Sequence, residues 1–186
     1  MVSLQTPVCE FGKKAPDFNL PGVDQQQWTL KKCVGERGLL VIFMSNHCPY
    51  VKAIRKKLVR DTRDLQLLGV NSVAIMPNDT VAYPEDSFEN MVRISKEFNF
   101  PFPYLLDVTQ EVARAYEAVC TPDFFGYNAD LELQYRGRLD AAGPKSDDDT
   151  QERELFKAMK QVAETGRGPE HQIPSMGCSI KWSETV

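Results

Sequence analysis

The sequence predicts an α/β fold, with a central mixed β-sheet flanked by helices. Two continuous apolar runs, 38–44 and 70–76, have the length and composition of buried strands. Residues 49–68 between them have the apolar spacing of an amphipathic helix, which indicates a right-handed parallel crossover. Two shorter strand patterns and a last helical pattern, 152–164, come later in the chain. Strands and helices in this order indicate helical layers around one sheet.

Before the first buried strand, the sequence predicts a loop followed by a small β-hairpin. Pro16, Pro21 and Gly22 interrupt short apolar stretches, and residues 18–20 and 28–30 have the composition of strands. We expect this hairpin to be an N-terminal extension of the sheet.

The first long helix has an apolar and a basic face. The apolar positions recur at helical spacing, and Gly69 is a typical stop residue for this helix. They are Val51, Ile54, Leu58, Leu65 and Leu68. The opposite face, expected to be solvated, carries Lys52, Arg55, Lys56, Lys57 and Arg60.

The second half of the chain predicts shorter elements. Pro84 and the acidic residues after it suit the first turn of a helix. The expected elements are a helix 84–98, a strand 104–106, a helix 112–119, strands 123–127 and 131–136, an exposed acidic loop 143–150 and the helix 152–164. From about residue 166 we expect an irregular C-terminal tail.

Length and composition favour an ordinary globular protein. The 186 residues suit one domain spanning 1–186, and 42% of them are hydrophobic. The net charge of −4 argues against nucleic acid or an anionic membrane as a partner. No apolar run reaches membrane-spanning length, and the N-terminus lacks the pattern of a signal peptide. We therefore expect a cytoplasmic protein.

The five cysteines do not form the pattern of a secreted disulfide framework, because they are scattered and odd in number. They are Cys9, Cys33, Cys48, Cys120 and Cys178. Each is either a buried small residue or a functional thiol. The two histidines lie far apart and no metal-ligand spacing is present, so we expect no metal and no cofactor.

Cys48 is the strongest candidate for a reactive thiol. It follows the first buried strand and opens the first long helix, where backbone N–H groups and the helix dipole favour an anion such as a thiolate. Pro49 suits the first helical position, and Lys52 adds positive charge nearby. His47 is either a proton acceptor or a residue with an orienting or packing role.

Residues 43–52 resemble the active-site stretch of thioredoxin-fold proteins, with Cys48 on the first cysteine of their motif and Val51 on the second. Thr121 and Pro122 resemble the cis-proline loop that faces the active cysteine in that fold. The resemblance is closest to the peroxiredoxin-like branch (AhpC/TSA-type, or redoxin) and covers about 12–163. Its pieces are 15–20, 46–52, 121–125 and 135–140, with 177–182 completing the set.

The resemblance implies a thioredoxin-like fold and a thiol–disulfide oxidoreductase or thiol-dependent antioxidant protein, with Cys48 as the nucleophile. Because Val51 replaces the second cysteine, the usual intrahelical disulfide cannot form. Peroxiredoxins also use a hydroxyl and an arginine to bind peroxide. Ser45 precedes Cys48 by three residues, and Arg136 or Arg138 is a candidate for that arginine.

Another thiol must therefore resolve any intermediate formed on Cys48. Cys120 directly precedes the loop at 121–122, and the resemblance places that loop against Cys48. Cys178 in the tail is the second candidate. The alternatives stay open, because Cys120 can be a buried small residue and the tail can simply dock through Ile180 and Trp182.

Two classes of function follow. The first is an enzyme that reduces a protein disulfide or a peroxide and draws on an external thiol reductant, such as a thioredoxin or glutathione system. The second is a non-catalytic thioredoxin-fold binding module that has lost the resolving cysteine. A homodimer is compatible with either.

Overall fold

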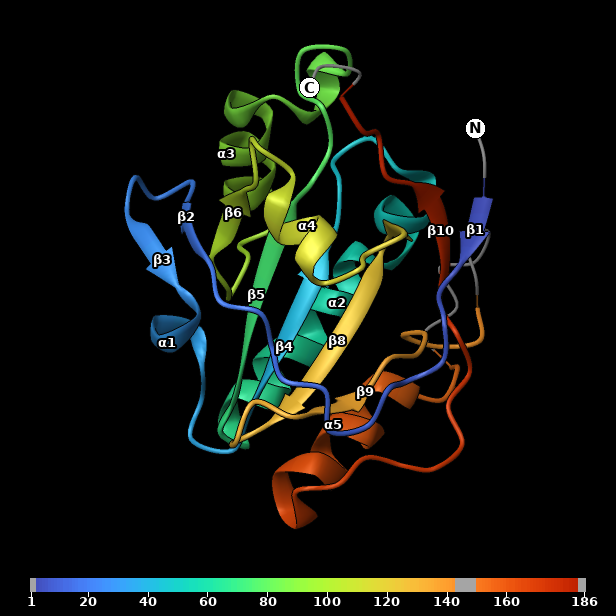
Figure 1. Ribbon diagram of the computed structural model, residues 1–186. Coiled ribbons are helices and arrows are strands. Elements are labelled where there is room, and N and C mark those ends of the chain that lie inside the picture. Colours follow the sequence, from blue (N-terminus) through green and yellow to red (C-terminus); the bar gives the residue numbers. More distant parts are fainter. Residues whose placement is uncertain (1–2, 143–149, 184–186) are drawn as a thin grey trace.

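The computed structural model, which describes residues 3–142 and 150–183, has the expected α/β architecture around a five-stranded sheet (Figure 1). The strand order is β6-β5-β4-β8-β9. The bounds are β4 Gly38–Phe43, β5 Val70–Met76, β6 Tyr104–Leu106, β8 Asp123–Asn128 and β9 Leu133–Tyr135. Strands β4, β5 and β6 run parallel, whereas β8 is antiparallel to β4 and to β9. The sheet is therefore mixed, as predicted.

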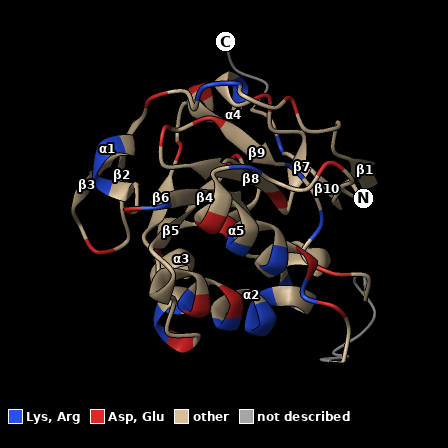
Figure 2. Cartoon of the chain, turned by 90° about the horizontal axis from the view of Figure 1, so that it is seen from below, with Lys and Arg blue, Asp and Glu red and all other residues tan. Residues whose placement is uncertain are grey.

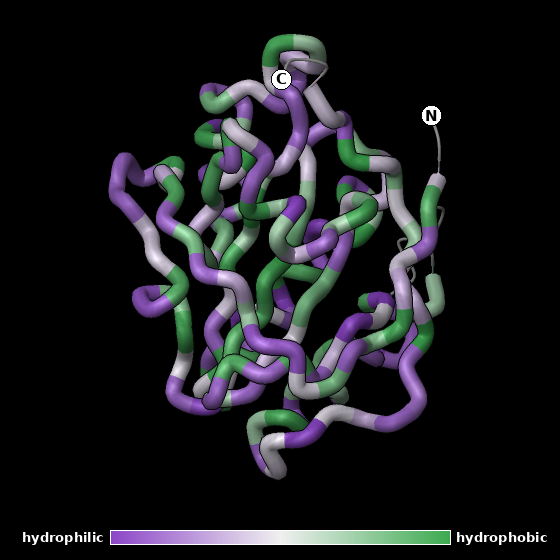
Figure 3. The backbone as a smooth tube through the Cα atoms, in the orientation of Figure 1, coloured by the Kyte–Doolittle hydropathy of each residue, from purple (hydrophilic) through white to green (hydrophobic). Residues whose placement is uncertain are grey.

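The central strand β4 separates two apolar cores, because successive side chains point to opposite faces of a sheet. Leu40 and Ile42 pack with α2 (Pro49–Leu67) and α5 (Glu154–Thr165) on one face. Leu39, Val41 and Phe43 pack on the other face with residues of the N-terminal hairpin and of α4 (Glu111–Ala115). Figure 3 shows the hydrophobic segments concentrated along these central strands.

The remaining elements lie around this sheet. They are β1 Ser3–Gln5, β2 Asn19–Pro21, β3 Gln27–Thr29, α1 Leu30–Cys33, η1 Pro84–Asp86, α3 Phe88–Glu97, β7 Cys120–Thr121 and β10 Met176–Ser179. Strands β2 and β3 pair antiparallel, so the predicted N-terminal hairpin is present. None of the helices in the described part of the chain has both the length and the apolar composition needed to cross a membrane.

The prediction of an irregular tail after residue 166 was wrong, because this segment contains β10. Strand β10 lies between β1 and β7 in a second, three-stranded antiparallel sheet. In Figure 1 the dark red β10 runs beside the blue β1 at the edge of the molecule. The sequence of β10 has no clear strand alternation, because Gly177 has no side chain, although Cys178 and Ile180 are buried.

Two predicted helices have different bounds. The segment 84–98 consists of the short 3₁₀ turn η1 followed by α3, because Ser87 caps α3 by accepting a hydrogen bond from the amide of Asn90. The helix expected at 112–119 ends at Ala115, and Glu117 has a left-handed backbone with φ of 54°. The short helix α1 was not predicted.

The basic face of α2 is only partly solvated, which corrects a further expectation. Lys57 is buried and its Nζ lies 2.6 Å from Oδ2 of Asp140. Arg55 is also buried, lies 4.7 Å from the ring centroid of Phe98 and donates to the backbone oxygen of Asn46. Figure 2 shows the basic residues of α2 interspersed with acidic ones. Most of the predicted acidic loop, residues 143–149, lies outside the described residues.

Candidate active site

Cys48 lies where β4 gives way to α2. It is the N-cap residue of α2, Pro49 occupies the first helical turn, and the amide of Lys52 donates to the Cys48 backbone oxygen. The Cys48 side chain makes no capping hydrogen bond and is therefore available to other groups. Strand β4 is buried along its whole length, so the backbone that leads to the thiol is held firmly on both sides.

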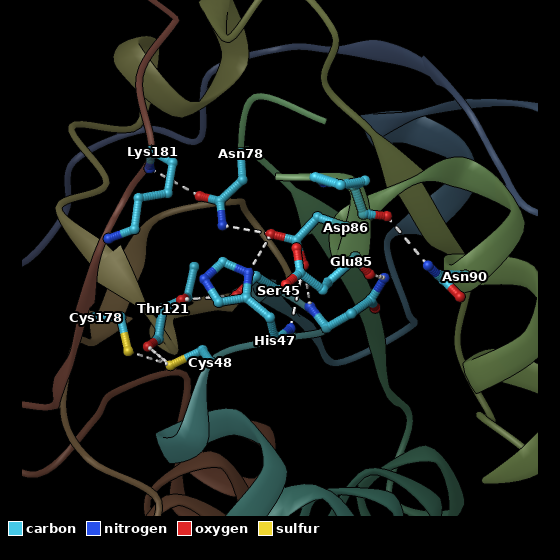
Figure 4. A network of polar contacts seen from close by, with 12 residues as sticks. Ser45, His47, Cys48, Asn78, Glu85, Asp86, Asn90, Thr121, Cys178 and Lys181 are labelled. Carbon is cyan, nitrogen blue, oxygen red and sulfur yellow. Dashed lines mark hydrogen bonds and ion pairs between the residues drawn. The ribbon is translucent and has the colours of Figure 1, made fainter. Parts of the chain in front are cut away.

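Two groups contact the Cys48 sulfur. Its Sγ lies 2.9 Å from the backbone oxygen of Thr121 and 2.8 Å from Sγ of Cys178 (Figure 4). Since a thiol has one proton, the Cys48 S–H serves one of these contacts at a time. Burial, followed by the hydrogen bond and the charge of Cys48, raises the pKa of the Cys178 thiol to about 12. Cys178 therefore keeps its proton at neutral pH.

The loop at Thr121 and Pro122 faces Cys48, as the resemblance implied. The peptide bond between these two residues is cis. Thr121 is fully buried, and its Oγ1 lies 3.2 Å from Oγ of Ser45. In the three-stranded sheet β1-β10-β7, called the outer sheet below, Thr121 is the register partner of Cys178. This pairing places Cys178 beside Cys48.

Asp86, at the end of η1, holds the turn that precedes Cys48. Its Oδ1 accepts from the amides of Asn46 at 2.8 Å and His47 at 3.2 Å. Its Oδ2 lies 2.7 Å from His47 Nδ1 and accepts from Asn78 Nδ2 at 2.8 Å. Burial acts to raise the pKa of Asp86, but the bonds from His47, Asn78 and Asn46 outweigh it, so this pKa is lowered. The His47 ring also stacks on Tyr83.

The same network reaches the C-terminal tail. Asn78 donates to Asp86 through its amide nitrogen, and its Oδ1 accepts from the backbone amide of Lys181. Figure 4 shows these bonds as one chain from His47 through Asp86 and Asn78 to Lys181. The carboxylate therefore links the turn before Cys48 to the segment directly after β10.

The structure places the two predicted resolving candidates differently. Cys178 contacts Cys48, whereas the Cys120 sulfur lies 3.5 Å from the backbone oxygen of Pro122. Burial, then the charge of Asp123, raises the pKa of Cys120 far above its ordinary value. Cys120 therefore has the character of a buried small residue next to the loop.

The other predicted site residues spread over a wider area. Lys52 is exposed, and Val51 is buried within the core on the α2 side. Arg136 is buried, with Nη2 3.0 Å from Asp123 Oδ2. Arg138 makes two hydrogen bonds to Glu154, at 2.9 and 2.6 Å. Among the described residues, neither guanidinium has a hydrogen bond to Cys48.

Sequence reasoning missed Asp86, Asn78 and Gly177. A signal for Asn78 was present, because it follows β5, and the carboxyl ends of the neighbouring parallel strands β4 and β5 meet at one edge of the sheet. For Asp86 the sequence indicates only that it lies near the start of a helix. In the described part of the chain no group of three or more His, Cys, Asp or Glu side chains has the arrangement of a metal site.

Comparisons with known proteins agree with this architecture. An uncharacterized conserved protein from Geobacillus kaustophilus is 42% identical, with a TM-score of 0.94 over 100% of this chain and 99% of that one. A hypothetical protein from Sinorhizobium meliloti 1021 is 38% identical, with a TM-score of 0.92 over 97% of this chain and 99% of its own. No curated relative matches the chain.

More distant structures share the fold. The thioredoxin domain of a thiol-disulfide oxidoreductase from Bacteroides vulgatus has a TM-score of 0.63 at 13% identity, over 82% of this chain and 97% of that domain. This likeness confirms the predicted thioredoxin-like fold. The sequence signature of the AhpC/TSA family matches residues 11–141. The chain therefore belongs to the AhpC/TSA family and has a thioredoxin-like fold.

Proposed function

We propose that this protein is a dithiol–disulfide oxidoreductase in which Cys48 and Cys178 are the redox pair. The observation that carries the proposal is the distance of 2.8 Å between their sulfur atoms. A disulfide bond is about 2.05 Å long, so a small movement closes the gap. Val51 stands where a thioredoxin has its second cysteine, and Cys178 supplies the missing thiol from the tail.

The roles of the two thiols follow from their surroundings. Cys178 holds its proton, since burial and the contact with Cys48 raise its pKa. Cys48 is on the rigid strand–helix junction at the N-terminus of α2, and its side chain makes no capping hydrogen bond, so its sulfur is free to react. We therefore assign the nucleophile to Cys48 and the resolving thiol to Cys178.

The proposed reaction has two exchange steps. The Cys48 thiolate attacks one sulfur of a substrate disulfide, which forms a mixed disulfide and releases the other sulfur as a thiolate that takes a proton from water. Cys178 then attacks the Cys48 sulfur, and its proton goes to the departing substrate thiol. The substrate disulfide is reduced to two thiols, and Cys48 and Cys178 become a disulfide. An external dithiol reductant returns the pair to its starting state.

Disulfides fit the site better than peroxides do. A peroxide site of the peroxiredoxin kind needs a hydroxyl and an arginine beside the reactive cysteine. Ser45 directs its hydroxyl to Thr121, and Arg136 and Arg138 are held in ion pairs with Asp123 and Glu154. These partners support a structural role for both arginines.

The test compares three cysteine variants. We expect Cys48→Ser to lose reduction of a small disulfide, such as hydroxyethyl disulfide, by at least about a thousandfold, because the nucleophile is gone. Cys178→Ser should stop after the first step and accumulate a mixed disulfide on Cys48, detected by mass spectrometry. Cys33→Ser is the matched control, since Cys33 is buried in α1 and packs in the core on the other face of the sheet from Cys48.

Oxidised wild-type protein should yield a peptide pair linking Cys48 to Cys178 after digestion. A link between Cys48 and Cys120 instead, or full turnover by Cys178→Ser, contradicts the assigned pair. If the folded wild-type protein shows no thiol exchange at Cys48, the result would favour the non-catalytic binding module.

A further inference from the structure

Strand β10 lies directly against the candidate active-site cysteine. Cys48 is 0% exposed and Cys178 is 1% exposed, although one of them must meet a substrate. Strand β10 carries Cys178 and pairs with β7 on one side and β1 on the other. In Figure 4 the two sulfurs lie between β10 and the start of α2. Because Cys178 of β10 lies 2.8 Å from the Cys48 sulfur, a movement of β10 would uncover Cys48 on this side.

The edge that β10 occupies fits a polypeptide backbone. Thr121 and Cys120 of β7 pair with Cys178 and Ser179 of β10, and both β7 residues are fully buried. Within the described residues, β10 is the only strand that pairs with β7 in this sheet. Removing β10 leaves backbone groups of β7 without partners, which is unfavourable unless another donor and acceptor replace them. A second extended chain supplies such backbone N–H and C=O groups, whereas a small disulfide such as hydroxyethyl disulfide has no peptide backbone to supply them.

A strand paired with β7 in this register needs glycine at the position of Gly177, directly before the cysteine. A Cβ at this position would lie 2.2 Å from the backbone oxygen of Thr121 and 2.5 Å from its carbonyl carbon. Both are backbone atoms of the buried loop next to Pro122, so they have little room to move. In this register only glycine fits directly before the cysteine.

A cavity of about 240 Å³ adjoins the same edge. Tyr50 of α2, Pro122 and Met176 of β10 are part of its lining, together with Phe124 and Leu139. Met176 precedes Cys178 by two residues. A segment that replaced β10 would therefore present its residue two before the cysteine to a largely apolar wall.

We propose that β10 stands in for a segment of a partner protein. The partner chemistry is an extended polypeptide with a Gly-Cys pair, whose cysteine is oxidised in a disulfide and whose residue two before the cysteine is apolar. This inference rests on the proposed function and names its substrate class. The partner segment pairs with β7 and brings its disulfide to Cys48.

Strand β10 and the partner segment then occupy the edge in turn. While the partner segment is on β7, the Cys48 thiolate attacks its cysteine sulfur. The mixed disulfide forms, the partner's own disulfide bond breaks, and its second sulfur leaves as a thiolate that takes a proton from water. When β10 returns, it displaces the partner backbone and brings Cys178 to the Cys48 sulfur. The Cys48–Cys178 disulfide forms and the partner cysteine leaves as a thiol that carries the proton of Cys178. The partner disulfide is thereby reduced and the Cys48–Cys178 pair is oxidised.

The experiment compares two peptide disulfides on the full-length Cys178→Ser protein. The first is the disulfide-linked dimer of the peptide Ser-Met-Gly-Cys-Ser-Ile, which has the sequence of residues 175–180. The second has valine in place of the glycine. Formation of the mixed disulfide on Cys48 is followed by mass spectrometry, and each rate is divided by that of the same peptide with free glutathione. Hydroxyethyl disulfide serves as the small-molecule reference.

We expect the glycine peptide to react at least about tenfold faster than the valine peptide, because the valine Cβ meets the Thr121 carbonyl. Equal normalised rates for the two peptides overturn the proposed segment recognition and leave the redox pair standing. Reaction with hydroxyethyl disulfide but with neither peptide has the same meaning. If none of the three disulfides reacts with Cys48, the proposed function itself fails.

Discussion

Strands β4 and β10 bring the two thiols together in opposite ways. All six residues of β4 are buried, and six register pairs hold it to β5 and six more to β8. Strand β10 has two register pairs with β7 and three with β1, and β1 is exposed along its length. The contrast supports the proposal that the nucleophile is fixed on the core and that the second thiol lies on a movable strand.

The largest difference between the two regions should appear in folding stability. We expect Leu40→Ala in β4 to lower the free energy of unfolding by about 2–5 kcal/mol, because it opens a cavity in a fully buried position. Leu4→Ala in β1, where 39% of the residue is exposed, should change it by about 0.5 kcal/mol or less. Chemical denaturation measures both, and equal losses would show that the outer sheet is as integral as the core.

A second test addresses the network that links the two regions. Asp86 accepts four hydrogen bonds with its two oxygens, whereas an asparagine has one acceptor oxygen. We expect Asp86→Asn to cost about 1–3 kcal/mol at pH 7. Glu89→Gln, at an exposed position of α3, is the matched control.

The pH dependence of this loss has a definite sign. The pKa of Asp86 is lowered in the folded protein, so its contribution is fully present above the unfolded pKa of about 3.9. It disappears as the pH falls through the lowered folded value. The difference between wild type and Asp86→Asn should therefore shrink below about pH 4 in denaturation experiments. A difference that stays constant down to pH 2 would refute the role of the charge.

The sequence predicts the β4 region much better than the β10 region. Strand β4 and the apolar face of α2 have strong periodic patterns, so the position of Cys48 at their junction follows directly. The antiparallel hairpin after Pro122 and the α5 helix were also recognised. Such elements depend mainly on local pattern and on burial against one sheet.

Strand β10 was missed because its stability comes from long-range pairing. Thr121 lies far from Cys178 in the chain, and no local pattern marks their register. For the same reason Cys120, which adjoins the loop in sequence, was the first candidate for the resolving thiol. The contact of Cys178 with Cys48 depends on the fold of the whole chain.

The last prediction measures how tightly β10 closes the site. Gly177→Val should prevent β10 from seating on β7, since a Cβ there would lie 2.2 Å from the Thr121 oxygen. We expect alkylation of Cys48 by iodoacetamide to rise about tenfold or more, which corresponds to about 1.4 kcal/mol of closure. Labelled peptides quantified by mass spectrometry give the rate at each cysteine.

Two controls make the result specific to β10. Leu4→Ala lies in the neighbouring strand β1 at a position that is 39% exposed, and it should leave the alkylation rate nearly unchanged. Cys33, buried under the opposite face of the sheet, should stay slow in both variants and so report an intact core. If Gly177→Val leaves Cys48 as slow as Cys33, then β10 is not the barrier, and the movable strand must be sought in another part of the structure around Cys48.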